Sequence, residues 1–211
     1  MKIILLGAPG SGKGSIAKLL VENFKLAHIS TGDLFRAAIN KDDEFAQQIK
    51  SIVSSGQYVP DSITNKIASD AIMEASKTHD GFILDGYPRT VDQANYLKEI
   101  TNIDYVLYLD IDNEELIKRI TGRRICPNCG AIYNVNTAPK PKNDNVCDVC
   151  GSLLIQRKDD NIEVAKKRID VYVEQTEPLI QFYDNEKILV KLNANQDLKT
   201  LFNEVKKIIT K

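Results

Sequence analysis

The chain has 211 residues, of which 43% are hydrophobic and 27% charged, a composition typical of a folded protein with one well-buried core. Its 28 basic and 29 acidic side chains give a net charge of −1, so no overall field attracts it to nucleic acid or to an anionic membrane. This composition excludes a disordered or fibrous protein, and it predicts that any function requiring positive charge is local.

The start of the chain contains an apolar run from Ile3 to Leu6, which is too short for the apolar region of a secretory signal. We also expect no membrane span, because no apolar stretch is long enough to cross a bilayer. These features predict a cytoplasmic protein. Thiols stay reduced there, so the cysteines, which are confined to positions 126–150, are expected to bind a metal rather than to form disulfides.

Short apolar runs alternate with amphipathic stretches, a pattern that predicts an α/β fold with a parallel sheet covered by helices on both faces. The expected strands are Lys2–Leu6, Ala27–Ser30, Phe82–Leu84, Tyr105–Asp110 and Ile188–Leu192. The expected helices are Ser15–Phe24, Ser62–Lys77, Val91–Glu99, Asn113–Thr121, Glu163–Tyr183 and a last one from Leu198 to Ile209. Residues 31–60 are predicted to form short helices and residues 122–158 a non-helical segment, both inserted into the one sheet.

A glycine-rich segment, Gly7-Ala-Pro-Gly-Ser-Gly-Lys13-Gly14-Ser15, lies between the first expected strand and the first expected helix. Its glycines, Gly7, Gly10, Gly12 and Gly14, allow positive φ angles, so that backbone N–H groups can converge on an anion. The helix N-terminus and the Lys13 ammonium add positive charge near the β and γ phosphates of a nucleotide. This context predicts a phosphate-binding loop rather than a merely flexible turn. Because Gly14 delays the hydroxyl to Ser15, direct ligation of Mg²⁺ by that hydroxyl is not assumed.

A carboxylate, Asp85, ends the apolar strand that begins at Phe82, and Gly86 and Pro88 then turn the chain. The carboxyl ends of parallel strands share one edge, so Asp85 is expected to face the same cleft as the phosphate loop. An isolated aspartate in such a place is usually a turn residue or a helix cap. Together with the Lys13 loop, however, it predicts a carboxylate that orients hydrated Mg²⁺.

The arginines lie near the ends of expected elements or in the insertions. They are Arg36, Arg89, Arg119, Arg123, Arg124, Arg157 and Arg168. A guanidinium holds a phosphoryl group with two parallel hydrogen bonds and does not titrate, so this placement indicates phosphoryl transfer. A solvated salt bridge remains an equal alternative for any one of them.

Two CxxC pairs, Cys126-Pro-Asn-Cys129 and Cys147-Asp-Val-Cys150, are each followed by a glycine that allows a tight turn. Their spacing is typical of a tetrahedral zinc site with four cysteine ligands. Iron, or two unligated redox pairs, are the alternatives. A site with no open ligand position indicates a structural rather than a catalytic metal.

Taken in order, several of these segments give the chain a resemblance to the adenylate kinases over its whole length. They are Gly7–Gly14 (GAPGSGKG), Ile29–Arg36 (ISTGDLFR), Leu84–Thr90 (LDGYPRT), Thr121–Arg124 (TGRR) and Arg157–Asp160 (RKDD). The cysteine pairs resemble those of the bacterial-type form with a long, metal-binding lid. Ser15 and Ile16 depart from this pattern, since they stand where the family usually has Thr and Gln.

The resemblance implies a P-loop kinase fold with a five-stranded parallel sheet and two mobile flaps. It divides the chain into a core of residues 1–29, 60–121 and 160–211, a helical flap of residues 30–59 that binds AMP, and a zinc-ribbon-like lid of residues 122–159. It also implies a cytoplasmic, monomeric enzyme that catalyses ATP + AMP ⇌ 2 ADP with Mg²⁺ bound to ATP and zinc in the lid, and that has neither nucleic acid nor membrane as a partner.

The resemblance also implies roles for single residues. The ATP side would comprise Gly10, Ser11, Gly12, Lys13, Gly14, Ser15, Arg119, Arg123, Ile132, Tyr133 and the backbone near Gln196. The AMP side would comprise Thr31, Arg36, Gln57, Tyr58, Val59, Gly86, Tyr87, Pro88, Arg89 and Gln93, with Arg157 and Arg168 clamping the transferred group. The catalytic set would be Lys13, Asp85, Arg89, Arg123, Arg157 and Arg168, the metal ligands Cys126, Cys129, Cys147 and Cys150, and Asp159 and Asp160 would close the lid hinge.

Two alternatives remain open at this point. One is a kinase that uses another nucleoside monophosphate as its acceptor. The other is a nucleic-acid-binding ATPase with a zinc ribbon, which is disfavoured because residues 126–150 carry few basic and aromatic side chains. Neither histidine is needed for phosphoryl transfer: His28 is expected to be a structural side chain within a strand and His79 a solvated residue at a helix end.

Overall fold

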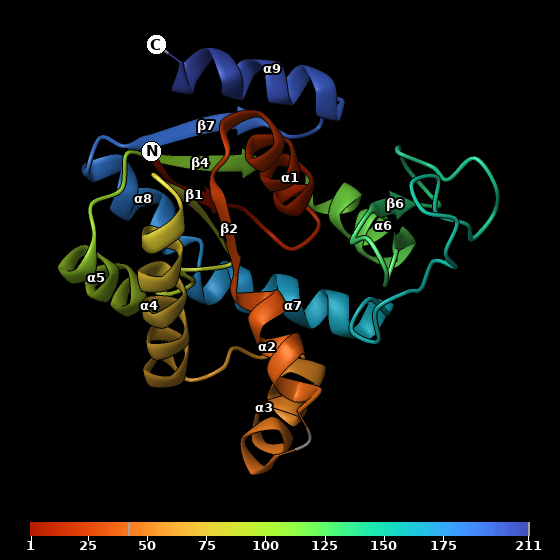
Figure 1. Cartoon of the computed structure of the whole chain (residues 1–211), viewed down its shortest axis with the longest axis horizontal. Coiled ribbons are helices and arrows are strands. Elements are labelled where there is room, and N and C mark those ends of the chain that lie inside the picture. Colours follow the sequence, from red (N-terminus) through yellow and green to blue (C-terminus); the bar gives the residue numbers. More distant parts are fainter. Residues whose placement is uncertain (42, 211) are drawn as a thin grey trace.

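The computed structural model describes residues 1–41 and 43–210, and it contains a five-stranded parallel sheet in the order β2-β3-β1-β4-β7 (Figure 1). The strands are β1 (Lys2–Leu6), β2 (Ala27–Ser30), β3 (Phe82–Asp85), β4 (Tyr105–Asp110) and β7 (Leu189–Asn193). The expected α/β architecture is therefore confirmed, with strand ends within one residue of the predicted ones.

The helices that connect and cover these strands follow the predicted order. They are α1 (Lys13–Phe24), α2 (Thr31–Ile39), α3 (Glu44–Ser54), α4 (Asp61–Thr78), α5 (Val91–Ile100), α6 (Asn113–Gly122), α7 (Ile162–Gln175), α8 (Pro178–Asn185) and α9 (Leu198–Ile209). None of the described helices is both long enough and apolar enough to cross a bilayer.

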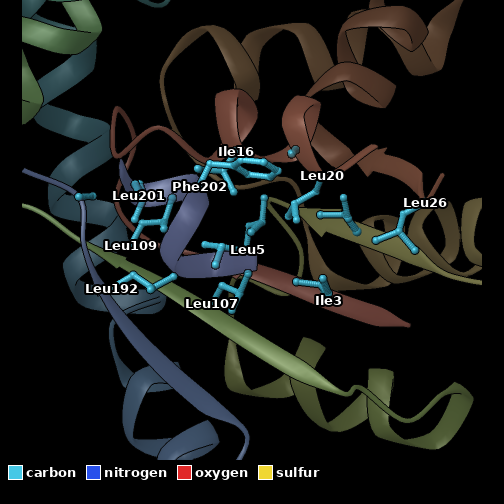
Figure 2. Packing of buried hydrophobic residues seen from close by; sticks show 14 residues of the cluster. Ile3, Leu5, Ile16, Leu20, Leu26, Leu107, Leu109, Leu192, Leu201 and Phe202 are labelled. Carbon is cyan, nitrogen blue, oxygen red and sulfur yellow. The ribbon is translucent and has the colours of Figure 1, made fainter. Parts of the chain in front are cut away.

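Alternate residues of the central strand β1 form two cores, one on each face of the sheet. Ile3 and Leu5 pack with side chains of α1 and α9, including Leu20 (Figure 2). Ile4 and Leu6 pack on the opposite face against α4, α5 and α8. Successive side chains of a strand point to opposite faces, which is why an uninterrupted apolar run occurs where both faces are covered.

The register of the sheet brings the two polar motifs of the sequence to one edge. Leu5 of β1 pairs with Asp85 of β3, so the glycine-rich loop after β1 and the turn after β3 leave the sheet side by side. Ser30, which ends β2, pairs with Asp85 from the other side. The carboxyl edge of the sheet therefore gathers three functional segments.

One predicted helix is wrong in extent. The stretch Glu163–Tyr183 is not a single helix, because α7 ends at Gln175 and α8 begins at Pro178. Proline has no N–H to donate and its ring collides with the preceding turn, so the helix is interrupted there and restarts with proline at its first position. The break leaves Thr176 and Glu177 as a short turn.

Two segments extend from the sheet and have small apolar clusters of their own. Helices α2 and α3 pack around Phe35, Ile49 and Val59. Strands β5 (Arg123–Ile125) and β6 (Ile132–Asn134) form a separate antiparallel pair, and a cluster including Cys126 and Leu154 lies beside them. Figure 1 shows the two segments on different sides of the molecule, with α2 and α3 at the bottom and the β6 region at the right.

Candidate nucleotide-binding site

A cavity of about 1150 Å³ opens at the carboxyl edge of the sheet. Its walls come from the loop after β1, from α2 and the segment that returns from α3, and from the region around β5 and β6. The arginines that line it are Arg36, Arg89, Arg119, Arg123, Arg157 and Arg168. The structure therefore brings the predicted phosphate loop and six of the predicted arginines around one space.

The glycine-rich loop has the backbone conformation that its sequence predicted, with one exception. Gly7, Gly10 and Gly12 have φ angles of 148°, 87° and 98°. Gly14 does not share this conformation, because α1 begins at Lys13 and Gly14 lies in its first turn. A Cβ on Gly14 would lie 3.4 Å from Ile132 Cδ1, which is van der Waals contact, so the β6 region closely approaches the start of α1.

Lys13 carries its charge into this loop. Its ammonium donates hydrogen bonds to the carbonyl oxygens of Gly7 at 2.7 Å and Ala8 at 2.9 Å. Burial lowers the pKa of Lys13 to about 8, and the positive charges of Arg89, Arg168 and Arg123 also lower it, while Asp85 opposes the shift. The ammonium is thus held among other cations, an environment that a polyphosphate would neutralise.

Under the predicted role of the loop, which is to bind a phosphoryl donor, this lowered pKa determines how activity depends on pH. Lys13 is protonated below pH 8 and loses its charge as the pH rises through about 8, so kcat/KM for the phosphoryl donor should decline above that pH. A bound triphosphate stabilises the ammonium, and kcat should therefore persist to higher pH. Initial rates between about pH 6.5 and 10 check this; a kcat/KM that stays flat across the range would contradict it.

Asp85 lies 3.5 Å from the Nε2 atom of His28, across the pair of strands that carry them. Burial by itself raises the pKa of Asp85, but the His28 ring and the charges of Lys13 and Arg89 outweigh it and hold that pKa below its ordinary value. The carboxylate is therefore ionised at neutral pH. Ionised oxygen ligands suit a hydrated Mg²⁺, so the donor set at this edge fits that ion.

The turn after β3 holds Arg89 beside the cavity. The Gly86 carbonyl accepts hydrogen bonds from Thr31 Oγ1 and from Arg89 Nε, both at 2.7 Å. Gly86 has a φ of 78°, and a Cβ there would lie 3.0 Å from Arg89 Nη2 and 3.2 Å from Thr31 Oγ1. Only glycine meets both requirements without strain, which explains the glycine between Asp85 and Tyr87.

A fully buried carboxylate organises the arginines at the other side of the cavity. Asp160, with no exposed surface, accepts a bidentate pair of hydrogen bonds from Arg123, one of them 2.9 Å long. Arg168 contacts the same carboxylate at 3.4 Å and Asp159 at 3.0 Å. Burial, followed by the nearby Arg123 and Arg36, lowers the pKa of Arg157 to about 10. Positive charge is therefore concentrated here beyond what the carboxylates neutralise.

The β5–β6 region lies directly over the glycine-rich loop. Ile132 reaches Gly14, and Arg119, Tyr133 and Gln196 also line the cavity. Tyr133 is only 6% exposed, and its hydroxyl accepts a hydrogen bond from the Asp148 N–H at 2.9 Å and lies 3.6 Å from the Cys147 sulfur. The hydroxyl of Tyr133 thus supports the cysteine cluster.

The four cysteines have sulfur atoms within 4.8 Å of one another. Cys126 and Cys150 are 3.4 Å apart, and Cys129 and Cys147 are 3.5 Å apart. Both CxxC pairs end in the same kind of turn. The N–H of Gly130 donates to the carbonyl oxygen of Cys126, and the N–H of Gly151 donates to the carbonyl oxygen of Cys147. Zinc with tetrahedral sulfur ligands at about 2.3 Å separates the sulfurs by roughly 3.8 Å, so the cluster fits such an ion.

Several predicted site residues are not among those that line the cavity. Thr31, Tyr87 and Gln93 are at most 1% exposed. Gln93 accepts from the Arg89 N–H and donates to Asp61, both at 2.7 Å. Arg124 donates instead to the carbonyl oxygens of Thr121 and Arg123.

Other cavity residues escaped the sequence analysis. His28 was expected to be structural, yet it lines the cavity beside Asp85; the signal for it was a polar residue within an apolar strand that ends at the same edge. Asp33, which pairs with Arg36 and lies 3.9 Å from Arg157, stands inside the ISTGDLFR segment. Thr176 lines the cavity because α7 ends there, which Pro178 could have indicated.

Comparison with known proteins gives a consistent result. The family model described as adenylate kinase matches residues 5–188. A curated protein named adenylate kinase from Ureaplasma urealyticum serovar 10 is 48% identical over 206 residues, covering 97% of this chain and 96% of its own. Those from Thermosipho africanus and Thermoanaerobacter sp. (strain X514) are 46% and 45% identical over 214 residues, and each alignment covers 99% of this chain and at least 98% of the relative.

Proposed function

This chain belongs to the adenylate kinase family and is thus a nucleoside monophosphate kinase, and on that premise we propose that it transfers the terminal phosphoryl group of ATP to AMP, giving two molecules of ADP. The observation that supports this most is that the glycine-rich loop, residues of the Gly86–Arg89 turn and six arginines all line one cavity. Two nucleotides that meet through their phosphates need such a space.

We propose that Lys13, with the backbone of Gly10–Ser15, holds the β and γ phosphates of ATP. Asp85 would hold Mg²⁺ through its water ligands, and when bound with ATP the ion supplies charge neutralisation. On the acceptor side, Arg36 and Arg89 would bind the phosphate of AMP. Arg123, Arg157 and Arg168 would surround the transferred group, since buried cations stabilise the charge that spreads over it.

The reaction needs positioning more than proton transfer. An oxygen of the AMP phosphate attacks the γ-phosphorus of ATP, the bond from that phosphorus to the β–γ bridging oxygen breaks, and ADP leaves with the electron pair. The attacking oxygen is already anionic at neutral pH, so no side chain acts as a general base. Holding both phosphates in line supplies most of the acceleration.

We propose that residues 30–59 and 122–159 are two flaps on a core of residues 1–29, 60–121 and 160–211. Asp33 of the first flap lies 3.9 Å from Arg157 of the second, which supports a closure in which the two meet over the nucleotides. Closure would exclude water, which otherwise competes with AMP for the phosphoryl group.

We propose zinc for the cluster of Cys126, Cys129, Cys147 and Cys150, in a structural role. The four thiolate ligands would fill its coordination sphere and leave no position for substrate. We further propose that the enzyme acts as a monomer in the cytoplasm, where its thiols remain reduced.

The acceptor preference tests the proposed function. We expect AMP to be strongly preferred over GMP, CMP and UMP, with Thr31 and Gln93 as the predicted contacts to adenine. Both side chains are hydrogen-bonded within the protein in this structure, so a contact with adenine requires them to exchange those partners. A base that offers no replacement either forgoes that contact or leaves a buried polar group unpaired, at about 1 to 3 kcal/mol each. A coupled assay with each acceptor at equal ATP measures kcat/KM; similar values for AMP and UMP or CMP would favour a kinase for another monophosphate.

A further inference from the structure

Tyr58 lies in the segment between α3 and α4, and its side chain connects two distant parts of the chain. Its ring stacks on the guanidinium of Arg89, with Cζ 4.8 Å from the ring centroid. Its hydroxyl lies 2.8 Å from Thr176 Oγ1, in the turn between α7 and α8. We propose that Tyr58 and Thr176 together are positioning residues for Arg89, a role that rests on the proposed function, in which Arg89 binds the acceptor phosphate.

The direction of the two hydrogen bonds follows from the number of protons that each group can donate. Thr176 Oγ1 lies 2.8 Å from the carbonyl oxygen of Arg89, which can only accept. A threonine hydroxyl has one proton, so it donates that proton to Arg89 and accepts from Tyr58. The result is a chain from Tyr58 through Thr176 to the Arg89 backbone, in which each hydroxyl polarises the next.

Four contacts within the protein hold Arg89 in place. Its Nε donates to Gly86, its backbone N–H donates to Gln93 at 2.7 Å, its carbonyl accepts from Thr176, and the ring of Tyr58 covers its face. Among the described residues, its two terminal nitrogens have no hydrogen-bond partner. They form the fork that binds two phosphate oxygens.

The anchor at Thr176 is itself rigid. The residue is 4% exposed, its N–H donates to Tyr172 at 2.8 Å and its carbonyl accepts from Leu179 at 2.9 Å. Gly56, close to Tyr58 in the chain, lies against the same helix, since a Cβ there would be 3.0 Å from Arg168 Cγ. The segment between α3 and α4 is therefore held against α7 and the α7–α8 turn. The ring of Tyr58, which belongs to this segment, in turn holds the guanidinium of Arg89.

The test compares variants that remove one link at a time. Tyr58→Phe keeps the ring and deletes the donor to Thr176, so we expect KM for AMP to rise about fivefold, the scale of one hydrogen bond, while KM for ATP changes less than about twofold. Thr176→Val also leaves the Arg89 carbonyl unpaired, and should raise KM for AMP by about tenfold or more. Thr176→Ser restores the hydroxyl and should return KM for AMP to within about twofold of the parent.

Non-additivity separates this role from a general loss of stability. The double variant Tyr58→Phe/Thr176→Val should bind AMP, measured by calorimetry, no more weakly than Thr176→Val alone, because both break one chain. Tyr96→Phe is the matched control, since the Tyr96 hydroxyl has no hydrogen bond within the described chain, and its AMP affinity should be unchanged. If Thr176→Val fails to fold, the test compares Tyr58→Phe with Tyr58→Leu. Tyr58→Leu should bind AMP more weakly than Tyr58→Phe, because it also loses the ring that stacks on Arg89.

The proposal is overturned if Tyr58→Phe binds AMP as the parent does, if AMP and ATP affinities fall equally, or if the two single effects add. Failure of the proposed function has a different signature: the parent enzyme itself would not phosphorylate AMP in preference to other acceptors.

Discussion

Lys13→Ala should lower the rate of phosphoryl transfer by roughly 10² or more while the protein stays folded. The ammonium lies among the carbonyl oxygens of the glycine-rich loop, where it would meet the β and γ phosphates of ATP. Removing a positioned cation from a transferring phosphoryl group commonly costs several kcal/mol of transition-state stabilisation. The measurement is kcat and kcat/KM in the direction of ADP formation.

The fold should tolerate this change, and the pKa gives the reason. Lys13 has a pKa of about 8 in the folded protein against 10.5 for the ordinary group, so its protonated form is disfavoured in the folded state. Between these values the unfolded chain binds more protons, and the contribution of Lys13 to stability rises with pH across that window and is least favourable below pH 8. The melting temperature of Lys13→Ala at pH 7 should therefore equal or exceed that of the parent.

Lys66→Ala is the matched control, because Lys66 is an exposed residue of α4 outside the cavity. It should retain parent activity and stability. A folded Lys13→Ala enzyme with near-parent turnover would contradict the role assigned to the loop, and with it the proposed donor site.

The sequence allowed the layered sheet and the phosphate loop to be predicted because both depend on local patterns. Alternation of apolar runs with helical periodicity marks the strands and helices, and Gly10 and Gly12 mark the positive φ angles that follow β1. The end of α7 was missed because the periodicity of its apolar residues continues across Thr176 into α8, and only Pro178 signals the interruption.

The arrangement of side chains within the cavity was less predictable. That Asp160 is fully buried and holds both Arg123 and Arg168 depends on how two segments far apart in the chain meet. The stack of Tyr58 on Arg89 has the same origin. Motifs indicate which residues belong to a site. The contacts that orient those residues arise from tertiary packing, which sequence periodicity does not reveal.

If zinc occupies the cysteine cluster, as proposed, its removal should destabilise residues 122–159 and leave the phosphate loop formed. The apolar cluster of this region is small: Cys126, Ala131, Tyr133, Cys147 and Leu154. Several other apolar side chains there are largely exposed, including Val149 at 68% and Leu153 at 71%. So little burial cannot order the segment, and a structural zinc ion can supply roughly 10 to 16 kcal/mol of apparent binding free energy.

The experiment is treatment with a strong chelator, beside Cys129→Ser, with metal analysis, thermal melts and hydrogen exchange. We expect one zinc per chain to be lost, the melting temperature to fall and residues 122–159 to exchange faster, with exchange in the sheet and in the loop after β1 unchanged. Lys140→Ala, an exposed substitution in the same region, should keep its metal and its melting temperature.

The loss of activity should follow the loss of order in residues 122–159, because the metal, in its proposed structural role, takes no part in the reaction. Ile132 reaches the glycine-rich loop at Gly14, and the Tyr133 hydroxyl rests on Cys147 and the Asp148 N–H, so loss of the knuckles loosens the wall of the cavity over the ATP phosphates. If ATP binds at this loop, as proposed, KM for ATP should therefore rise, with residual turnover from the fraction of molecules in which the region still folds. A metal-free protein whose residues 122–159 remain protected from exchange, yet which has lost all phosphoryl transfer, would show that the metal takes part in the chemistry.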